Sequence, residues 1–395
     1  MDIERYRSDT PGCSHRVHLN NAGSGLMPSP VINAITSHIK LESEIGGYEA
    51  QDAQSDAIAA AYRSVANLLG TTADNIAFTE NATASFVQAL SAISFESGDI
   101  ILTTRNDYAS NQIQFLSLQA RLGVQVIRAP DQYQGGVDVA ALIALIDKHR
   151  PRLVCVTHVP TNSGLVQDIN AVGNACAAAG IIYLVDACQS IGQLPIRVDD
   201  IQCDFLTATA RKFLRGPRGS GFLYVSDRML EQQLAPLFVD MSGASWTGED
   251  SYQIVDTAKR FENWEFAWAQ VLGTGAAADY AISVGVDNIR VRVEGLVRQL
   301  REGLSSVDKV RVLGNDEELC GIVTVTVDGQ DPYEMVSALR AQGINVSAQG
   351  REYAVIDYDQ KNVVSALRIS PNYYNTGSEI DQVVAAIDSV SSVNL

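Results

Sequence analysis

Residues 183–225 read YLVDACQSIGQLPIRVDDIQCDFLTATARKFLRGPRGSGFLYV, and this stretch decides the fold. An apolar run over 181–185 ends in Asp186, and a second apolar run is followed closely by Lys212. A Gly- and Pro-rich segment, 215–221, then leads into a third apolar run. Short apolar runs bounded by turn residues are typical of buried strands. The sequence therefore predicts a carboxylate and an amine at the ends of two neighbouring strands.

This pair of side chains has a known chemical use. A lysine amine can form a Schiff base with the aldehyde of pyridoxal 5'-phosphate, and a carboxylate can keep the cofactor's pyridine nitrogen protonated so that the ring accepts electrons. Each residue alone also has an ordinary explanation, because Asp186 could cap a helix and Lys212 could be a surface lysine. The two together are more specific than either one.

The rest of the chain supports an α/β fold. Over residues 71–260, strands that are apolar throughout alternate with helices, which predicts a mostly parallel sheet covered on both faces. The run 221–225 is expected to return along the edge of this sheet, and one helix is expected over 50–69. With 395 residues, the chain suits a large domain plus a smaller one. We expect an extended N-terminal arm, a large cofactor-binding α/β domain and a small C-terminal α+β domain, over residues 1–30, 31–285 and 286–395.

Composition excludes several classes of partner. The net charge is −17, so nucleic acid is not an expected partner. No apolar run approaches the roughly 18 residues that span a bilayer, and the polar N-terminus has no signal-peptide pattern. The six cysteines are scattered without a CxxC pair, which favours reduced thiols. We expect a cytoplasmic protein that binds no membrane and no metal.

Polar residues follow several of the predicted strands. In an open parallel sheet, ligands bind beyond the carboxyl ends of the strands, so these residues could meet at one site. Thr83 opens a helix whose N-terminus suits a phosphate, although an ordinary helix cap would look the same. Tyr108 could stack on an aromatic ring or lie at the rim of the sheet. The group comprises Glu80, Asn81, Ala82, Thr83, Tyr108, Thr161, Asn162, Asp186, Gln189, Thr209, Ala210, Arg211 and Lys212.

Several motifs together resemble one family. They are HLNNAGSG at 18–25, LLGTTADNIAFTENATASF at 68–86, HVPTNSGLVQDI at 158–169 and the stretch quoted first. In order and spacing they resemble the class V aminotransferase group of fold-type I pyridoxal phosphate enzymes, over nearly the whole chain. That group holds cysteine desulfurases, selenocysteine lyases, C–S β-lyases, isopenicillin N epimerase-like proteins and kynureninase-like hydrolases.

The resemblance implies a role for each matching residue. Lys212 would form the Schiff base and later move protons at the substrate Cα. Asp186 would pair with the pyridine nitrogen, Gln189 would contact the ring hydroxyl, and Tyr108 would stack on the ring. Asn162 or Thr161 would lie near the ring. The phosphate would be held by Asn81, Ala82, Thr83, Thr209 and Arg211.

The resemblance also implies the substrate side of the site. Arg368 resembles the arginine that binds the substrate α-carboxylate, a task that suits a bidentate guanidinium. The remaining expected substrate contacts are Asn21, Tyr48, Trp264 and Arg351. Members of the group build their sites at a dimer interface, so a homodimer is expected, with an amino acid as substrate.

Two departures from the family bear on the reaction. Desulfurases carry a catalytic cysteine in the loop before the strand of Arg368, whereas residues 346–353 contain none. Glu265 stands where the family often has a threonine that reaches the partner subunit's phosphate. Without the loop cysteine, a desulfurase is disfavoured and a C–S β-lyase acting on a cysteine S-conjugate or its sulfoxide is expected. Segments GGYEA (46–50) and RKFLRGPRG (211–219) are most similar to hercynylcysteine sulfoxide lyases.

Other outcomes stay open at this stage. An epimerase or racemase needs a second acid or base on the opposite face of the ring, for which Tyr48, Tyr108 and Tyr353 are the candidates. An aminotransferase or a decarboxylating oxidative deaminase could act on a similar conjugate. A protein that binds the cofactor without catalysis is disfavoured by the intact pair of Asp186 and Lys212.

Overall fold

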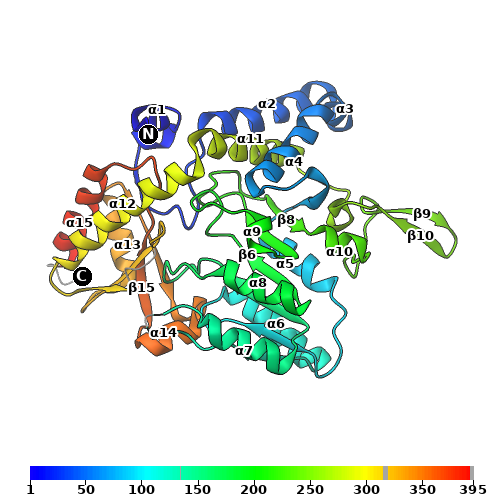
Figure 1. Cartoon of the computed structure of the whole chain (residues 1–395). Helices are drawn as coiled ribbons and strands as arrows, with labels where there is room; N and C mark the ends of the chain where they lie inside the picture. The colour runs from blue at the N-terminus through cyan, green and yellow to red at the C-terminus, as the bar shows by residue number, and fades with distance from the viewer. Residues whose placement is uncertain (134, 315–318, 392–395) are drawn as a thin grey trace.

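The computed structural model describes residues 1–133, 135–314 and 319–391, and a seven-stranded sheet lies at its centre (Figure 1). The order across the sheet is β2-β8-β7-β6-β5-β3-β4, and the strands from β7 to β4 are parallel. The prediction of an α/β fold with a mostly parallel sheet is confirmed. The strands are β2 (Ile76–Thr79), β3 (Ile100–Thr103), β4 (Gln125–Arg128), β5 (Leu153–Thr157), β6 (Ile182–Asp186), β7 (Phe205–Thr209) and β8 (Gly221–Val225).

Strand β8 is not at the edge of the sheet, so that prediction is wrong. It runs antiparallel between β7 and β2, and Phe222 is paired with Ala208 on one side and with Phe78 on the other. The physical reason is that the backbone of β8 is hydrogen-bonded on both sides, to β7 and to β2, which only an interior strand can be. The edge position on this side belongs to β2.

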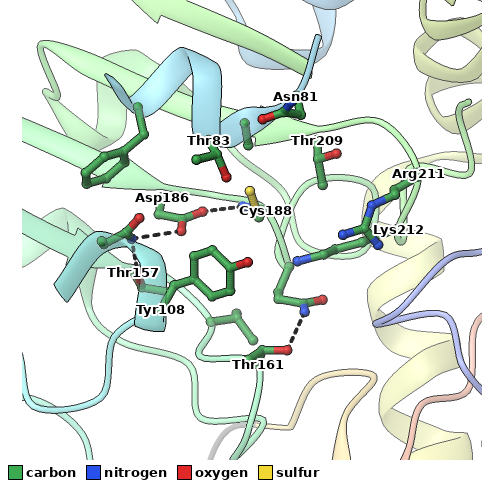
Figure 2. Close-up of a pocket in the computed structure, with 15 residues that line it drawn as sticks. Asn81, Thr83, Tyr108, Thr157, Thr161, Asp186, Cys188, Thr209, Arg211 and Lys212 are labelled. Atoms are coloured by element: carbon green, nitrogen blue, oxygen red, sulfur yellow. Dashed lines mark hydrogen bonds between the residues drawn. The ribbon is translucent and has the colours of Figure 1, made fainter. Parts of the chain in front are cut away.

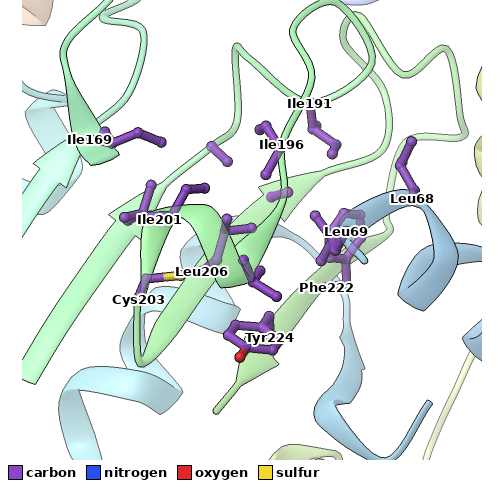
Figure 3. Close-up of a cluster of buried hydrophobic side chains, with 14 of the residues drawn as sticks. Leu68, Leu69, Ile169, Ile191, Ile196, Ile201, Cys203, Leu206, Phe222 and Tyr224 are labelled. Carbon is purple, nitrogen blue, oxygen red and sulfur yellow. The ribbon is translucent and has the colours of Figure 1, made fainter. Parts of the chain in front are cut away.

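Helices cover both faces of this sheet, each over its own apolar core. One core, part of which Figure 3 shows, joins the sheet to α4, α7, α8, α9 and α11. The other core joins it to α5, α6 and α10. The helices of this part are α2 (Ser29–Ile45), α3 (Gly47–Ala53), α4 (Ser55–Leu69), α5 (Ala82–Ser91), α6 (Ala109–Leu122), α7 (Val139–His149), α8 (Ile169–Ala179), α9 (Val198–Ile201), α10 (Asp227–Glu231) and α11 (Trp268–Val284).

The helix predicted over 50–69 is in fact two helices, α3 and α4. They meet at Gln54, whose backbone angles of φ −107° and ψ 12° leave the helical region. The hairpin of β9 (Ala244–Gly248) and β10 (Ser251–Ile254) was not predicted, and it projects from the body of the molecule (Figure 1). Its residues are mostly exposed, so they lack the alternation of buried and exposed positions that marks a strand in sequence.

A smaller antiparallel sheet forms the C-terminal part. Its order is β11-β12-β15-β14, and its strands are antiparallel. The strands are β11 (Val310–Leu313), β12 (Val323–Val327), β14 (Ser347–Gly350) and β15 (Ser365–Ile369), and the helices are α12 (Val286–Ser305), α13 (Pro332–Ala341), α14 (Val355–Lys361) and α15 (Gly377–Ser391).

The N-terminal segment packs against this C-terminal part rather than forming an extended arm. It begins with α1 (Ile3–Ser8), and β1 (Val17–His18) pairs in parallel with β13 (Ile344–Asn345). Tyr6 and Leu19 are buried in the same apolar core as the C-terminal strands. The domain boundaries at residues 30 and 286 stay a proposal. In the part of the chain that the structure describes, no helix is long and apolar enough to cross a membrane.

Candidate functional site

A cavity opens at the carboxyl ends of the strands of the large sheet (Figure 2). Every cofactor-binding residue predicted from the sequence lines it, apart from Asn162. The parallel strands end at one edge, which is why side chains far apart in sequence meet there. The lining residues are Asn81, Ala82, Thr83, Phe86, Tyr108, Asn111, Thr157, Val159, Thr161, Asp186, Cys188, Gln189, Thr209, Arg211 and Lys212.

Asp186 is the last residue of β6 and is buried at the floor of this cavity. One of its carboxylate oxygens accepts a hydrogen bond from the Nδ2 of Asn111 at 3.1 Å. The other accepts from the backbone N–H of Cys188 at 2.9 Å. Two donors hold the carboxylate in one orientation at the floor of the cavity, where it can face a protonated pyridine nitrogen.

Lys212 lies in the turn after β7, and its amine is enclosed by the cavity. The Nζ atom is 6.0 Å from the centre of the Tyr108 ring. Burial lowers the pKa of the Lys212 amine from its ordinary value, which increases the neutral fraction that can attack an aldehyde. Gly25 passes so close that a Cβ there would lie 2.5 Å from the Lys212 carbonyl oxygen. Position 25 therefore requires glycine, because any side chain there would clash with the backbone of Lys212.

The start of helix α5 lies at one end of the cavity. Asn81 caps this helix by accepting a hydrogen bond from the backbone N–H of Ala84 at 3.0 Å, so the first N–H groups of the helix are left to bind an anion. A Cβ on Gly221 would lie 2.6 Å from the Asn81 carbonyl carbon and 2.7 Å from the Ala82 nitrogen. The glycine thus allows the helix start to lie directly on β8.

The residues present fit pyridoxal phosphate. Gln189 donates its amide to the Ala22 carbonyl at 3.1 Å and to the Thr161 hydroxyl at 2.9 Å. Its Oε1 is buried without a hydrogen-bond partner, which leaves one polar atom for a ligand such as the ring hydroxyl. Together with the buried amine of Lys212 and the carboxylate of Asp186, this gives a donor and acceptor set that matches the cofactor.

Arg368 comes from β15 and lies behind Thr161, which lines the cavity. Its Nη1 donates to the Thr161 hydroxyl at 2.5 Å, and its Nε donates to the Ser347 hydroxyl at 3.2 Å. Only 5% of Arg368 is exposed, and burial lowers its pKa to about 10. No described carboxylate forms a salt bridge with it. A buried guanidinium without an acidic partner is ready to bind the carboxylate of a ligand.

The structure does not bring all the predicted residues to the cavity. The amide of Asn162 donates instead to Asn106 at 3.2 Å and to Asp357 at 2.7 Å, so Thr161 is the residue of this pair that lines the site. The amide of Asn21 is likewise occupied, since it donates to the Ser370 carbonyl at 2.8 Å.

Three predicted substrate residues lie at the surface. Tyr48 is 70% exposed and Trp264 is 53% exposed. Arg351 is also exposed, and it forms a salt bridge with Asp359 at 2.5 Å. These side chains contact no part of the cavity in their own chain.

Sequence reasoning missed several residues of the site. Asn111 and Cys188 were not singled out, although Asn111 lies one helical turn beyond Tyr108 and Cys188 lies two residues beyond Asp186. That spacing is a usable signal, because residues i and i+3 share a helix face. Thr157, the last residue of β5, and the buried Asp107, which Thr157 and Asn111 contact, were missed as well.

Comparison with known sequences is consistent with this site. The family model described as "Aminotransferase class-V" matches residues 17–383. A probable cysteine desulfurase from Methanothermobacter thermautotrophicus is 28% identical, covering 100% of this chain and 99% of that protein. A cysteine desulfurase from Pectobacterium atrosepticum is also 28% identical, covering 98% of each chain.

Solved structures show the same fold. The cysteine desulfurase CsdA from Escherichia coli matches with a TM-score of 0.90 at 22% identity, over 99% of each chain. The cystine C–S lyase C-DES, in complex with cysteine persulfide, matches with a TM-score of 0.85 at 23% identity, over 96% of this chain and 99% of that one. A variant of C-DES holds glycine covalently linked to its pyridoxal phosphate. With the matched family model and the fitting site, the cofactor is pyridoxal 5'-phosphate, and the chain belongs to the class-V aminotransferase family.

Proposed function

We propose that this chain is a pyridoxal phosphate-dependent C–S β-lyase that cleaves a cysteine S-conjugate, or its sulfoxide, to a thiol or sulfenate, pyruvate and ammonia. The observation that supports this proposal is the segment beside Arg368. Residues Ser347–Gly350 form strand β14, which pairs directly with β15 so that Ser347 lies opposite Arg368. No residue from 346 to 353 is a cysteine, so the segment offers no thiol to take up sulfur.

The site's own residues suffice for such a reaction. Arg368 would bind the α-carboxylate of the amino acid, and the Lys212 amine would take the proton from Cα. When bound, the cofactor supplies an electron sink for the electrons released at that carbon. Asp186 would hold the proton on the ring nitrogen. Overall the Cβ–S bond breaks, the leaving sulfur takes a proton, and one water is consumed as the amine leaves as ammonia.

The strongest alternative is a cysteine desulfurase, the activity named for the relatives. Cys188 is the residue that favours it, since its side chain lines the cavity. Burial raises the pKa of this thiol well above its ordinary value, whereas attack on sulfur needs the thiolate. Cys188 also lies beside Asp186, at the ring-nitrogen end of the site rather than beside Arg368. Both features disfavour it as a sulfur acceptor.

An epimerase or an aminotransferase outcome would use the same site. Tyr108 faces Lys212 across the cavity, so its hydroxyl is the acid or base that an epimerase would need on the second face. The finer resemblance to hercynylcysteine sulfoxide lyases, and a cytoplasmic location, stay proposals.

The test is product analysis with purified holoenzyme. The substrates are a panel of S-substituted cysteines, their sulfoxides and free cysteine, and the products to be measured are pyruvate, alanine and the D-amino acid. We expect pyruvate from at least one conjugate, at an unchanged rate in Cys188→Ala. The control is Cys13→Ala, a half-buried thiol outside the cavity. Alanine from cysteine that disappears in Cys188→Ala would favour a desulfurase, and a D-product would favour an epimerase.

We further propose that the chain acts as a homodimer, as members of its family typically do. Large apolar side chains are exposed on the loop before β9 and on the projecting hairpin, where a second copy could cover them. They are Leu237, Phe238, Met241, Trp246 and Tyr252. Exposed clusters of this kind usually mark an interface. Phe238→Glu combined with Trp246→Glu should shift the sedimentation coefficient from dimer to monomer, and an unchanged value would contradict this interface.

A further inference from the structure

A buried acid lies behind the carboxylate that faces the ring nitrogen. We propose that Asp107 and Asn111 are positioning residues that fix Asp186 and keep the cofactor's ring nitrogen protonated. The proposal rests on the cofactor and is independent of which reaction follows.

Asp107 lies in the turn between β3 and α6 and is 5% exposed. It is surrounded by hydrogen-bond donors, and no described basic side chain forms a salt bridge with it. The donors are the Thr157 hydroxyl at 2.5 Å, the Gln112 amide at 2.7 Å, the Tyr108 backbone N–H at 2.7 Å, the Asn111 amide at 3.1 Å and the Thr103 hydroxyl at 3.1 Å. A carboxylate has about four lone-pair positions, so these donors occupy its accepting capacity.

Asn111 connects this acid to the site. Its Nδ2 donates to Asp107 Oδ1 at 3.1 Å and to Asp186 Oδ2 at 3.1 Å. Both partners are carboxylate oxygens that can only accept when ionised, so the amide must turn its nitrogen toward them. One NH₂ group has two protons, and both are used. The bridge places the two carboxylates within about 6 Å of each other.

The bridge through Asn111 couples the electrostatics of the two buried acids. Burial raises the pKa of Asp107, and the charge of Asp186 raises it further, while the hydrogen bonds from Thr157, Gln112 and Asn111 favour the ionised form. The nearby thiols of Cys155 and Cys188 stay neutral because burial raises their pKa values well above the ordinary range.

The cations of the cavity are the side chains of Lys212 and Arg211. The Lys212 amine is the group that bonds to the cofactor aldehyde, and the Arg211 guanidinium donates to the Gly23 carbonyl. The proton on the ring nitrogen is then the positive charge that lies against Asp186. The amide of Asn111, which Asp107 orients, holds the Asp186 carboxylate in place beside that proton. Because the Tyr108 N–H also binds Asp107, the same acid fixes the stacking residue.

The decisive experiment measures the ring nitrogen itself. Holoenzyme is reconstituted with cofactor labelled with ¹⁵N in the ring, and the nitrogen chemical shift is followed across pH without substrate. In Asn111→Leu, which removes the bridge, we expect the ring-nitrogen pKa to fall by about one unit and cofactor to bind about tenfold more weakly. The matched control is Gln112→Leu, which removes another donor to Asp107 without touching Asp186. It should leave the nitrogen signal unchanged.

Asn111→Ser is the second variant, for use if the leucine variant does not fold, and it should shift the signal in the same direction. A ring nitrogen that stays protonated over the same pH range in both Asn111 variants would overturn the proposal. An equal shift of the nitrogen signal in Gln112→Leu would also overturn the proposal, because the shift would then reflect a general loss of packing. Because no substrate is present, failure of the β-lyase assignment does not alter this measurement.

Discussion

The hydroxyl of Thr161 accepts a hydrogen bond from Arg368 Nη1 at 2.5 Å and one from Gln189 Nε2 at 2.9 Å. A guanidinium can only donate, and the Ala22 carbonyl fixes the orientation of the Gln189 amide. Both lone pairs of the hydroxyl are therefore occupied, and its proton points elsewhere. Thr161 lines the cavity, so a ligand there can accept that proton. Thr161 therefore joins Arg368 and Gln189, the residues proposed to bind the substrate carboxylate and the ring hydroxyl.

Replacing this hydroxyl should weaken substrate binding. Thr161→Val keeps the shape but removes one acceptor from Arg368 and one from Gln189, and a lost bond to a charged group costs about 1.5–3 kcal/mol. We expect kcat/KM to fall roughly 10- to 100-fold, mostly through KM. Thr161→Ser, which retains the hydroxyl, should stay within about threefold of the original enzyme. Equal losses in both variants would mean that the methyl group matters and the hydroxyl does not.

Arg368 should be essential for binding the substrate carboxylate. Removing one partner of a buried charge pair typically costs about 2–5 kcal/mol, so Arg368→Ala should lower kcat/KM by about 30- to 1,000-fold or more while the visible spectrum of the bound cofactor persists. Arg368→Lys should recover little, because an ammonium cannot replace a planar bidentate group.

The control for this prediction is Arg351→Ala. Arg351 is exposed and paired with Asp359, and a surface pair of this kind contributes little to stability. The Arg351→Ala substitution should change kcat/KM by less than about twofold if the site is complete within one chain. A large loss would instead place Arg351 in the site of a partner subunit, as its predicted substrate role would require.

Lys212→Ala should abolish turnover and change how the cofactor is held. The covalent bond is lost, so the absorbance of the lysine-linked cofactor should disappear and the cofactor should be removable by dialysis. Asp186 and the start of α5 should still bind it reversibly. Lys259→Ala is the matched control, since that amine lies 4.6 Å from the Tyr62 ring and outside the cavity. Normal absorbance in Lys212→Ala would contradict the assignment of the lysine.

Glu262 should make the stability of the fold depend on pH. Its Oε1 accepts from the Tyr62 hydroxyl at 2.8 Å and from the Phe78 backbone N–H at 2.7 Å. Burial is the main cause that raises its pKa from 4.5 to about 7. The folded state therefore binds a proton more tightly than the unfolded chain. The stabilisation is complete below pH 4.5 and is lost as the pH rises to about 7, by about 3 kcal/mol.

Glu262→Gln keeps the accepting oxygen and removes the titration. The free energy of unfolding, measured with denaturant at pH 5 and pH 8, should fall with pH by about 2–3 kcal/mol more in the original protein than in Glu262→Gln. Glu80→Gln, a change at an exposed carboxylate, should leave the pH dependence as it is. If the free energy of unfolding changes equally with pH in all three proteins, Glu262 does not titrate between pH 5 and pH 8.

The sequence alone determined the strand ends and the chemistry that lies there. Apolar runs that stop at Asp186 and just before Lys212 mark where two strands end, and parallel strands bring their ends to one edge. The start of α5 was also predicted closely, because Thr83 was expected to open a helix after a buried strand and α5 begins at Ala82. Local patterns suffice in these cases because each depends only on neighbouring residues.

Only the tertiary structure decided which side chains turn inward. Thr161 faces the cavity because Arg368, 207 residues away, holds it there. Asn162 is also buried but points away from the cavity, because Asp357, 195 residues away, accepts its amide. The bridge from Asp107 through Asn111 to Asp186 likewise joins separate segments. Hydrogen bonds between distant segments depend on how the elements pack, and no local pattern in the chain encodes that packing.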